Sequence, residues 1–219
     1  MTAEEFEIFW SATYSLIVPL SYKMRVDYSS RWFRIRSLPE SKRYPSIDEE
    51  LGITLYRQNT MITDLVGVKS DLLPITGEYD YNSSNSTQGQ FLHDGSSSCL
   101  ELTKLKHIEL DKLVPDPHLP DENRPAEVYN LFVAEVNWQF GAHDFILKDT
   151  ANWVITAMGF FVAANYVIAP YDGGMGILVK DTAIRNQYKE KYGDWLSKRE
   201  CNCTASLEIY KYSSSSLIL

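Results

Sequence analysis

The pattern of hydrophobic and polar positions predicts a chain that mixes helices with strands. Residues 2–12 open with acidic side chains, repeat apolar ones at helical spacing and begin at Thr2, a good N-cap, so they are expected to form a helix. Residues 14–26 and 31–38 are expected to be two strands joined by a short turn, the second with clear alternation of its side chains. Pro39 ends that strand because proline has no N–H to donate to a neighbouring strand.

The longest helix is predicted over residues 46–66. Ser46 and Glu49 fit the two halves of a capping box, and Gly67 is placed to end the helix. A strand over residues 72–79 is expected to follow.

The middle of the chain has little periodic pattern. Residues 81–98 are rich in Ser, Asn and Gly and are expected to form a flexible loop. Residues 99–113 are ambiguous between a strand and a helix, because their apolar side chains fit neither period cleanly. A proline-rich connector comes next. We expect one domain over residues 1–199 with a tail at 200–219, and the middle leaves open a division into two lobes within residues 80–125.

Strand-forming residues dominate the second half. The expected elements are strands over residues 128–138, 158–170 and 175–180 and a short helix over 145–154. Residues 168–180 have the pattern of a hairpin, in which Gly173 and Gly174 can supply the positive φ of a tight turn. An amphipathic helix over 182–198 follows. The predicted fold class is therefore α+β: a mostly antiparallel sheet with helices packed on it, and a C-terminal β-hairpin followed by an amphipathic helix.

Composition and charge narrow the classes of function. The chain has 219 residues, with 21 Lys and Arg against 29 Asp and Glu, which gives a net charge of −8. This acidic balance excludes non-specific nucleic-acid binding, which requires excess positive charge. No apolar run approaches the ~20 residues that cross a bilayer, and the acidic start lacks the pattern of a secretory signal. The three cysteines, Cys99, Cys201 and Cys203, are an odd set that we expect to be free thiols, and the sequence predicts a cytoplasmic protein without membrane contact.

The sequence lacks the strong catalytic motifs. It has no glycine-rich phosphate loop ending in Gly-Lys-Ser/Thr, no His-Glu helix for zinc, no Cys-x-x-Cys and no Gly-x-Ser-x-Gly elbow. We therefore assign no catalytic residue, no metal ligand and no cofactor.

One basic segment, the basic strip over residues 31–44, stands out in this acidic chain. Arginine forks bind phosphate or carboxylate at two points, and aromatic rings offer stacking partners, so the strip is a candidate binding surface. The competing interpretation is that its cations pair with the protein's own carboxylates. The candidate residues of the strip are Arg31, Trp32, Arg34, Arg36, Lys42, Arg43 and Tyr44.

A second candidate lies at the tip of the predicted hairpin. Tyr171 and Asp172 precede the two glycines there, and a carboxylate on a rigid turn is well placed to bind a ligand. Aspartate is also a common turn former, so a purely structural role stays open.

Three segments give the chain a family resemblance. They are Leu-Pro-Glu-Ser-Lys-Arg-Tyr from Leu38, Pro-Tyr-Asp-Gly-Gly from Pro170, and Tyr-Gly-Asp-Trp-Leu-Ser from Tyr192. In these the chain resembles an uncharacterised bacterial family of unknown function. The resemblance covers most of residues 14–198 and implies a bacterial cytoplasmic protein in which the closing hairpin and helix recur. It implies no reaction and no catalytic residues.

We expect a non-catalytic protein-binding module, an immunity- or antitoxin-like inhibitor of a basic partner such as a toxin. The absence of catalytic motifs, the 13% aromatic content and the negative charge favour this hypothesis. The alternative is a small hydrolase or transferase acting on a phosphorylated or nucleotide substrate, with Arg34, Arg36, Lys42 and Arg43 holding the anion and Asp172 or Asp144 acting as base or metal ligand. The sequence does not identify the ligand, the partner or the oligomeric state.

Overall fold

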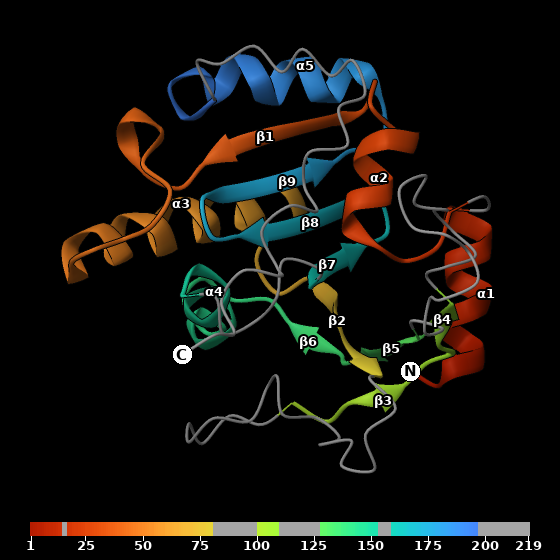
Figure 1. The fold of residues 1–219 in the computed structure, drawn as a ribbon. Helices are drawn as coiled ribbons and strands as arrows, with labels where there is room; N and C mark the ends of the chain where they lie inside the picture. Colours follow the sequence, from red (N-terminus) through yellow and green to blue (C-terminus); the bar gives the residue numbers. More distant parts are fainter. Residues whose placement is uncertain (15–16, 81–99, 110–127, 153–158, 197–219) are drawn as a thin grey trace, which may run out of the picture.

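A single antiparallel sheet organises the molecule (Figure 1). The computed structural model describes residues 1–14, 17–80, 100–109, 128–152 and 159–196. Seven strands follow one another in the order β1-β9-β8-β7-β2-β5-β3, while β4 pairs with β5 and β6 pairs with β2. The strands are β1 (Trp32–Arg36), β2 (Asp71–Asp80), β3 (Thr103–Lys104), β4 (Ile108–Glu109), β5 (Val128–Val133), β6 (Val136–Asn137), β7 (Phe160–Ala163), β8 (Tyr166–Tyr171) and β9 (Gly174–Leu178).

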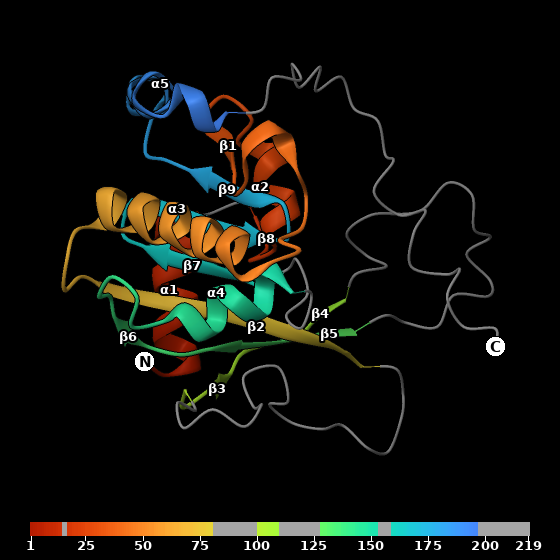
Figure 2. The same ribbon diagram turned by 90° about the vertical axis from the view of Figure 1, so that its left-hand side faces the viewer.

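Helices cover both faces of this sheet and confirm the α+β prediction. Figure 2 shows α3 and α4 side by side on one face, with α1 on the other. In Figure 1, α2 lies on the α1 side and α5 runs along β1 at the margin of the sheet. The helices are α1 (Ala3–Thr13), α2 (Ser21–Asp27), α3 (Asp48–Val66), α4 (Asp144–Ala151) and α5 (Thr182–Lys191), with short 3-10 turns η1 (Pro39–Ser41) and η5 (Gly193–Trp195).

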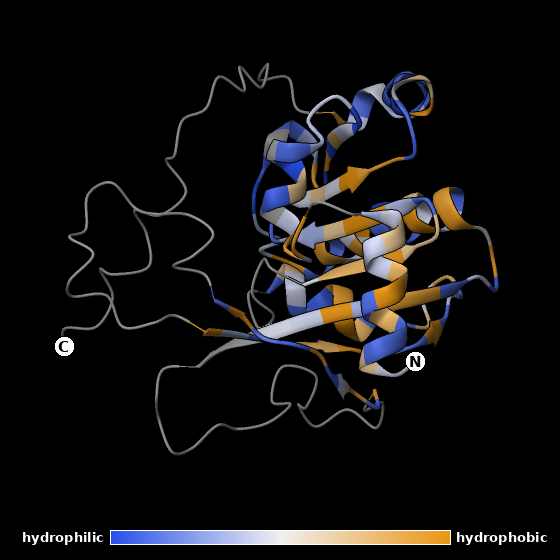
Figure 3. Ribbon diagram, turned by 90° about the vertical axis from the view of Figure 1, so that its right-hand side faces the viewer, coloured by the Kyte–Doolittle hydropathy of each residue, from blue (hydrophilic) through white to orange (hydrophobic). Residues whose placement is uncertain are grey.

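Each face of the sheet has its own hydrophobic core. Strand alternation sends Phe33 and Ile35 of β1 toward α3, where they join buried residues such as Met61. Phe6 and Trp10 of α1 belong to the opposite core. Figure 3 shows the consequence: the strands are largely orange or pale, while α5 at the margin is largely hydrophilic.

The opening helix forms as predicted. Thr2 accepts a hydrogen bond from the Glu5 backbone N–H (3.2 Å), and the Glu5 carboxylate accepts one from the Thr2 N–H (2.6 Å). This reciprocal capping box lowers the pKa of Glu5, chiefly through the Thr2 backbone hydrogen bond.

The strand predicted over residues 14–26 is wrong. Within that range the structure has α2, which starts just after Pro19 and turns Leu20 and Met24 into the core, both fully buried. The residues have strand-forming character, but a short helix buries these two side chains on one face. Tertiary packing therefore overrides local preference.

The capping box predicted at Ser46 is also wrong. The N-cap of α3 is Ile47, which makes no side-chain capping bond. The Glu50 carboxylate instead accepts from the Ser46 N–H (2.7 Å). Gly67 ends the helix as predicted, with a φ of 85°.

Two predicted strands and the unassigned segment 99–113 are divided in the structure. The described part of residues 99–113 forms β3 and β4, residues 128–138 form β5 and β6, and β7 turns at residues 164–165 into β8. The parts of two of these segments keep a common neighbour, since β5 and β6 both pair with β2, while β3 and β4 both pair with β5. Periodicity finds the apolar residues of such segments but not the point where pairing is interrupted.

The closing unit is confirmed as a hairpin followed by a helix. Tyr171 pairs with Gly174, so Asp172 and Gly173 form the turn. The positive φ expected for Gly173 and Gly174 in this turn is wrong: among the described glycines, only Gly67 and Gly141 have a positive φ. α5 is shorter than predicted, because the helix ends at Lys191 and η5 follows.

Several predictions lie outside the described residues. These are the loop over 81–98, the tail at 200–219, all three cysteines and the proline-rich connector over 115–125. In the part of the chain that the structure describes, no helix is long and apolar enough to span a membrane.

Candidate functional site

The β8–β9 turn holds a buried carboxylate. Asp172 is only 7% exposed, and its Oδ1 accepts a hydrogen bond from the Gly173 N–H (2.9 Å). The Ser37 N–H donates to the Gly173 carbonyl (3.2 Å), which fixes the turn to the end of β1. A Cβ on Gly174 would lie 2.1 Å from the Ile35 carbonyl oxygen, so close strand approach requires glycine there.

Arg43 brings the basic strip to this carboxylate. Its Nε donates to Asp172 Oδ2 at 2.6 Å, although the two residues are 129 positions apart in sequence. The Arg43 side chain is still 60% exposed. The buried carboxylate therefore holds one edge of the guanidinium while much of the side chain faces solvent.

Tyr44 completes the arrangement, which we call the hairpin site (Arg43, Tyr44 and Asp172). The Arg43 guanidinium lies 5.1 Å from the centre of the Tyr44 ring. Partial desolvation and then the neighbouring Asp172 carboxylate raise the pKa of Tyr44, and the two side chains share a hydrogen bond. Tyr44 also lines a shallow hollow of about 320 Å³ with Pro45, Ala151 and Asn152. No sequence pattern indicated that the end of α4 would lie here.

Other cations of the strip are taken up by different partners. Lys42 Nζ pairs with the Glu50 carboxylate at 2.5 Å. Arg31 lies at the far end of β1, where it donates to the Lys180 carbonyl (3.0 Å) and stands over the Tyr28 ring at 4.1 Å. The strip is thus not one continuous surface: internal pairing accounts for Lys42 and for one edge of Arg43.

The remaining candidates share the sheet face that carries α1 and α2. In the pairing of β1 with β9, Arg34 lies opposite Gly176 and Arg36 lies opposite Gly174. On the other edge of β9, Tyr171 of β8 pairs with the same Gly174. The Trp32 ring covers Gly176, where an added Cβ would meet ring atoms at 2.2 Å.

Two polar atoms on this face are buried without a hydrogen-bond partner among the described residues. They are the Trp32 indole nitrogen and the Tyr171 hydroxyl. Arg34 makes no ion pair within the same part of the chain. The structure brings Trp32, Arg34, Arg36 and Tyr171 together on one face, and Arg43, Tyr44 and Asp172 at the turn.

Asp144, the other carboxylate considered as a base, has a structural role. Its Oδ1 accepts from the Asn59 amide (2.6 Å), and Asn59 accepts from the Gly141 N–H (2.7 Å). This bridge joins α3 to the start of α4. In the described ranges, no group of three or more His, Cys, Asp or Glu side chains is placed to hold a metal ion.

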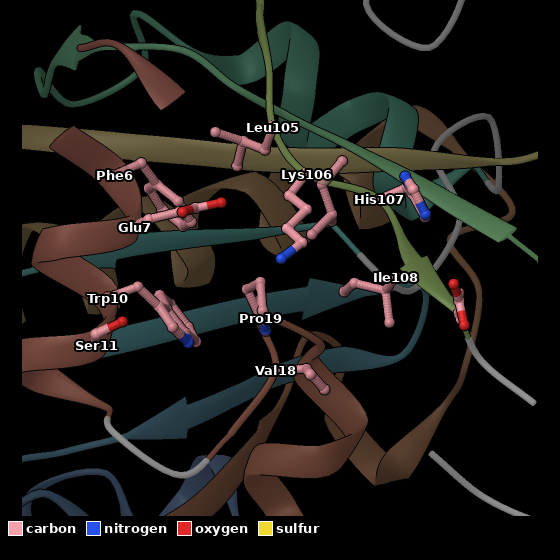
Figure 4. A pocket seen from close by; sticks show the side chains of 12 residues that line it. Phe6, Glu7, Trp10, Ser11, Val18, Pro19, Leu105, Lys106, His107 and Ile108 are labelled. Carbon is pink, nitrogen blue, oxygen red and sulfur yellow. The ribbon is translucent and has the colours of Figure 1, made fainter. Parts of the chain in front are cut away.

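A second concavity was not found by sequence reasoning. An apolar hollow of about 410 Å³ opens between α1, residues 18–19 and the β3–β4 segment (Figure 4). Its lining comes from four separate parts of the chain, and strand segments of two residues give no periodic signal. We call it the apolar hollow; its residues are Phe6, Glu7, Trp10, Ser11, Val18, Pro19, Leu105, Lys106, His107, Ile108, Glu109 and Leu131.

Comparison with known proteins places the chain in a family. No curated protein and no solved structure matches it. The model of one family, described as a domain of unknown function (DUF3885), matches residues 20–200. This range includes β1, the hairpin site and α5, and it begins after α1. Since the match extends over most of the sequence, the chain belongs to the DUF3885 family of domains of unknown function.

Proposed function

We propose that this chain is a non-catalytic protein-binding module that contacts its partner through the hairpin site. In this proposal it acts in the bacterial cytoplasm as an immunity- or antitoxin-like inhibitor of a basic protein. The supporting observation is the buried Asp172 carboxylate, which fixes the orientation of an exposed arginine beside an exposed tyrosine.

Preorganisation is what makes this pair suitable for binding. Arginine and tyrosine are enriched among the residues that dominate interface energies. Fixing a long arginine side chain on binding normally costs conformational entropy, and here the 2.6 Å bond to Asp172 has already restricted it. The shallow hollow beside Tyr44 offers a place for a partner side chain.

The surroundings of the pair favour a basic partner. The exposed carboxylates of Glu40, Asp48 and Glu49 belong to the segments on either side of it. Together with the net charge of −8, they would attract a cationic surface over several ångströms and accelerate encounter. Arg43 would then meet a carboxylate or carbonyl on the partner.

Photo-crosslinking tests the proposal. A photoreactive residue at position 44 should capture one partner of basic isoelectric point from cells that carry the protein. The same residue at position 56 should not, because Tyr56 is exposed to 60% but belongs to the middle of α3.

The affinity of each variant for the purified partner is then measured. Tyr44→Ala should weaken binding by about 2 kcal/mol, roughly thirtyfold, whereas Tyr56→Ala should change it less than about threefold. Association should slow as salt rises, because added ions screen the acidic surface. Equal effects of the two variants, or no product from position 44, would overturn the proposal.

A second candidate function rests on the sheet face of Trp32, Arg34 and Tyr171. Arg34 without an ion pair and two buried donors without acceptors are groups that a phosphate could satisfy. This supports the alternative of an enzyme or binder for phosphorylated or nucleotide compounds. Thermal-shift measurements with nucleotides and sugar phosphates test it: stabilisation that Arg34→Gln removes and Tyr44→Ala preserves would favour this alternative.

A further inference from the structure

The apolar hollow is built on the α1 face of the sheet, within the core opposite the one that α3 covers. Phe6 and Trp10, one helical turn apart on α1, form one wall. Leu105 and Ile108 from the β3–β4 segment and Leu131 of β5 also line the hollow. A volume of about 410 Å³ lies within the usual range for small-molecule sites.

The inner walls have few polar atoms to offer a ligand. The Trp10 indole N–H already donates to the Ile17 carbonyl at 2.6 Å. The Leu105 N–H donates to the Leu131 carbonyl at 2.8 Å, so that backbone is paired as well. A polar group placed against these walls would lose its water without gaining a partner. The part of a ligand that enters must therefore be hydrocarbon.

One cation, Lys106, lines the hollow and indicates the charge of the ligand's polar end. Figure 4 shows the Lys106 side chain extending from the β3–β4 segment toward the α1 wall. Lys106 makes no ion pair with the residues that the structure describes, and the N-terminal ammonium is already held by Glu135 at 3.0 Å. Glu7 of α1 and Glu109 of β4 also line the hollow and repel anions, so an anion is held only where it lies against the Lys106 ammonium. An anionic head group is therefore favoured at Lys106.

From this arrangement we infer that the hollow binds a straight-chain carboxylic acid, with its alkyl chain between α1 and β3–β4 and its carboxylate at Lys106. The site is separate from the proposed protein-binding surface, since none of its residues belongs to the hairpin site. Trp10 would lie against the alkyl chain and report its arrival.

Titration of the full chain with octanoate, decanoate and dodecanoate, followed by tryptophan fluorescence and calorimetry, tests the inference. Affinity should rise about fourfold for each added methylene until the hollow is full. Trp10→Phe should remove the fluorescence change while calorimetry still detects binding.

Matched variants test the head group. Lys106→Gln should weaken decanoate binding about tenfold and leave decanol binding unchanged. Lys104→Gln is the control, because Lys104 is an exposed lysine two residues away that does not line the hollow. Decylamine should bind more weakly than decanoate. Equal effects of the two lysine variants, tighter binding of decylamine, or no saturable binding of monomeric decanoate would overturn the inference.

Discussion

The hairpin site and the apolar hollow are built on opposite principles. At the hairpin site a charged group is buried and both of its oxygens have a partner: Asp172 accepts from Arg43 and Gly173. At the hollow the walls are apolar, and the polar atoms near Trp10 and Leu105 are already paired within the chain. The first region is held by directional bonds and the second by non-directional contact.

This difference predicts how each region tolerates change. A buried carboxylate that loses its partner retains the cost of leaving water, so the hairpin site should respond sharply to single substitutions. An apolar wall that is already open to solvent loses little when a polar rim residue is replaced. The two regions also differ in their relation to the family, because the matched residues 20–200 contain the hairpin site but not the α1 wall of the hollow.

The largest effect is expected from Gly174→Ala. The added methyl would lie 2.1 Å from the Ile35 carbonyl oxygen, which is backbone and cannot rotate away. Separation of β1 from β9 should cost about 3 kcal/mol of unfolding free energy, measured by urea denaturation. Gly52→Ala is the control: nothing lies within 4 Å of its new Cβ, and the substitution should stabilise α3 by up to about 1 kcal/mol. Similar losses in both variants would contradict the close approach.

Alkaline pH should weaken the α1 side of the molecule next. Burial raises the pKa of Tyr14 from 10.0 to about 12. Because the folded state holds this proton more tightly than the unfolded state, the contribution is fully present below pH 10 and is lost as pH rises toward 12. The loss should reach about 2 to 3 kcal/mol.

Unfolding curves from pH 8 to 12 measure this dependence. Tyr14→Phe should make stability decline less steeply, because phenylalanine has no proton to lose. Tyr56→Phe, at an exposed position, should keep the wild-type slope. Parallel slopes for all three proteins would show that Tyr14 does not determine the alkaline limit.

A smaller and asymmetric effect is expected at the hairpin site. Arg43→Ala leaves the Asp172 carboxylate buried without its cation and should cost about 2 kcal/mol. Asp172→Asn should cost about 1 kcal/mol, since asparagine can still accept from the Gly173 N–H and the exposed arginine can rehydrate. Chemical denaturation at pH 7 measures both. A larger loss for Asp172→Asn would mean that the carboxylate does not organise this site as we describe.

The smallest effect is expected from Lys106→Gln at the rim of the hollow. Lys106 is exposed and makes no ion pair within the described ranges, so unfolding free energy should change by less than about 0.5 kcal/mol. A loss comparable to that of Arg43→Ala would show that the rim also carries structural charge pairs.

Sequence patterns predicted the elements whose signals are local. The capping box of Thr2 and Glu5, the alternation in β1 and the hairpin before α5 all depend on residues within a few positions of one another. The α+β class followed from the same signals. Residues 14–26 were misassigned because burial of Leu20 and Met24 against the sheet decided their conformation.

The candidate residues were found in sequence, but their grouping was not. Arg43 and Tyr44 belonged to one predicted surface and Asp172 to another, and the structure joins them while it places Arg31 at the far end of β1. The sequence by itself determined the negative charge, the absence of strong catalytic motifs and most local elements. Only the tertiary structure decided which cation meets Asp172 and where the apolar hollow opens, because both depend on contacts between segments far apart in the chain, which periodicity and composition do not encode.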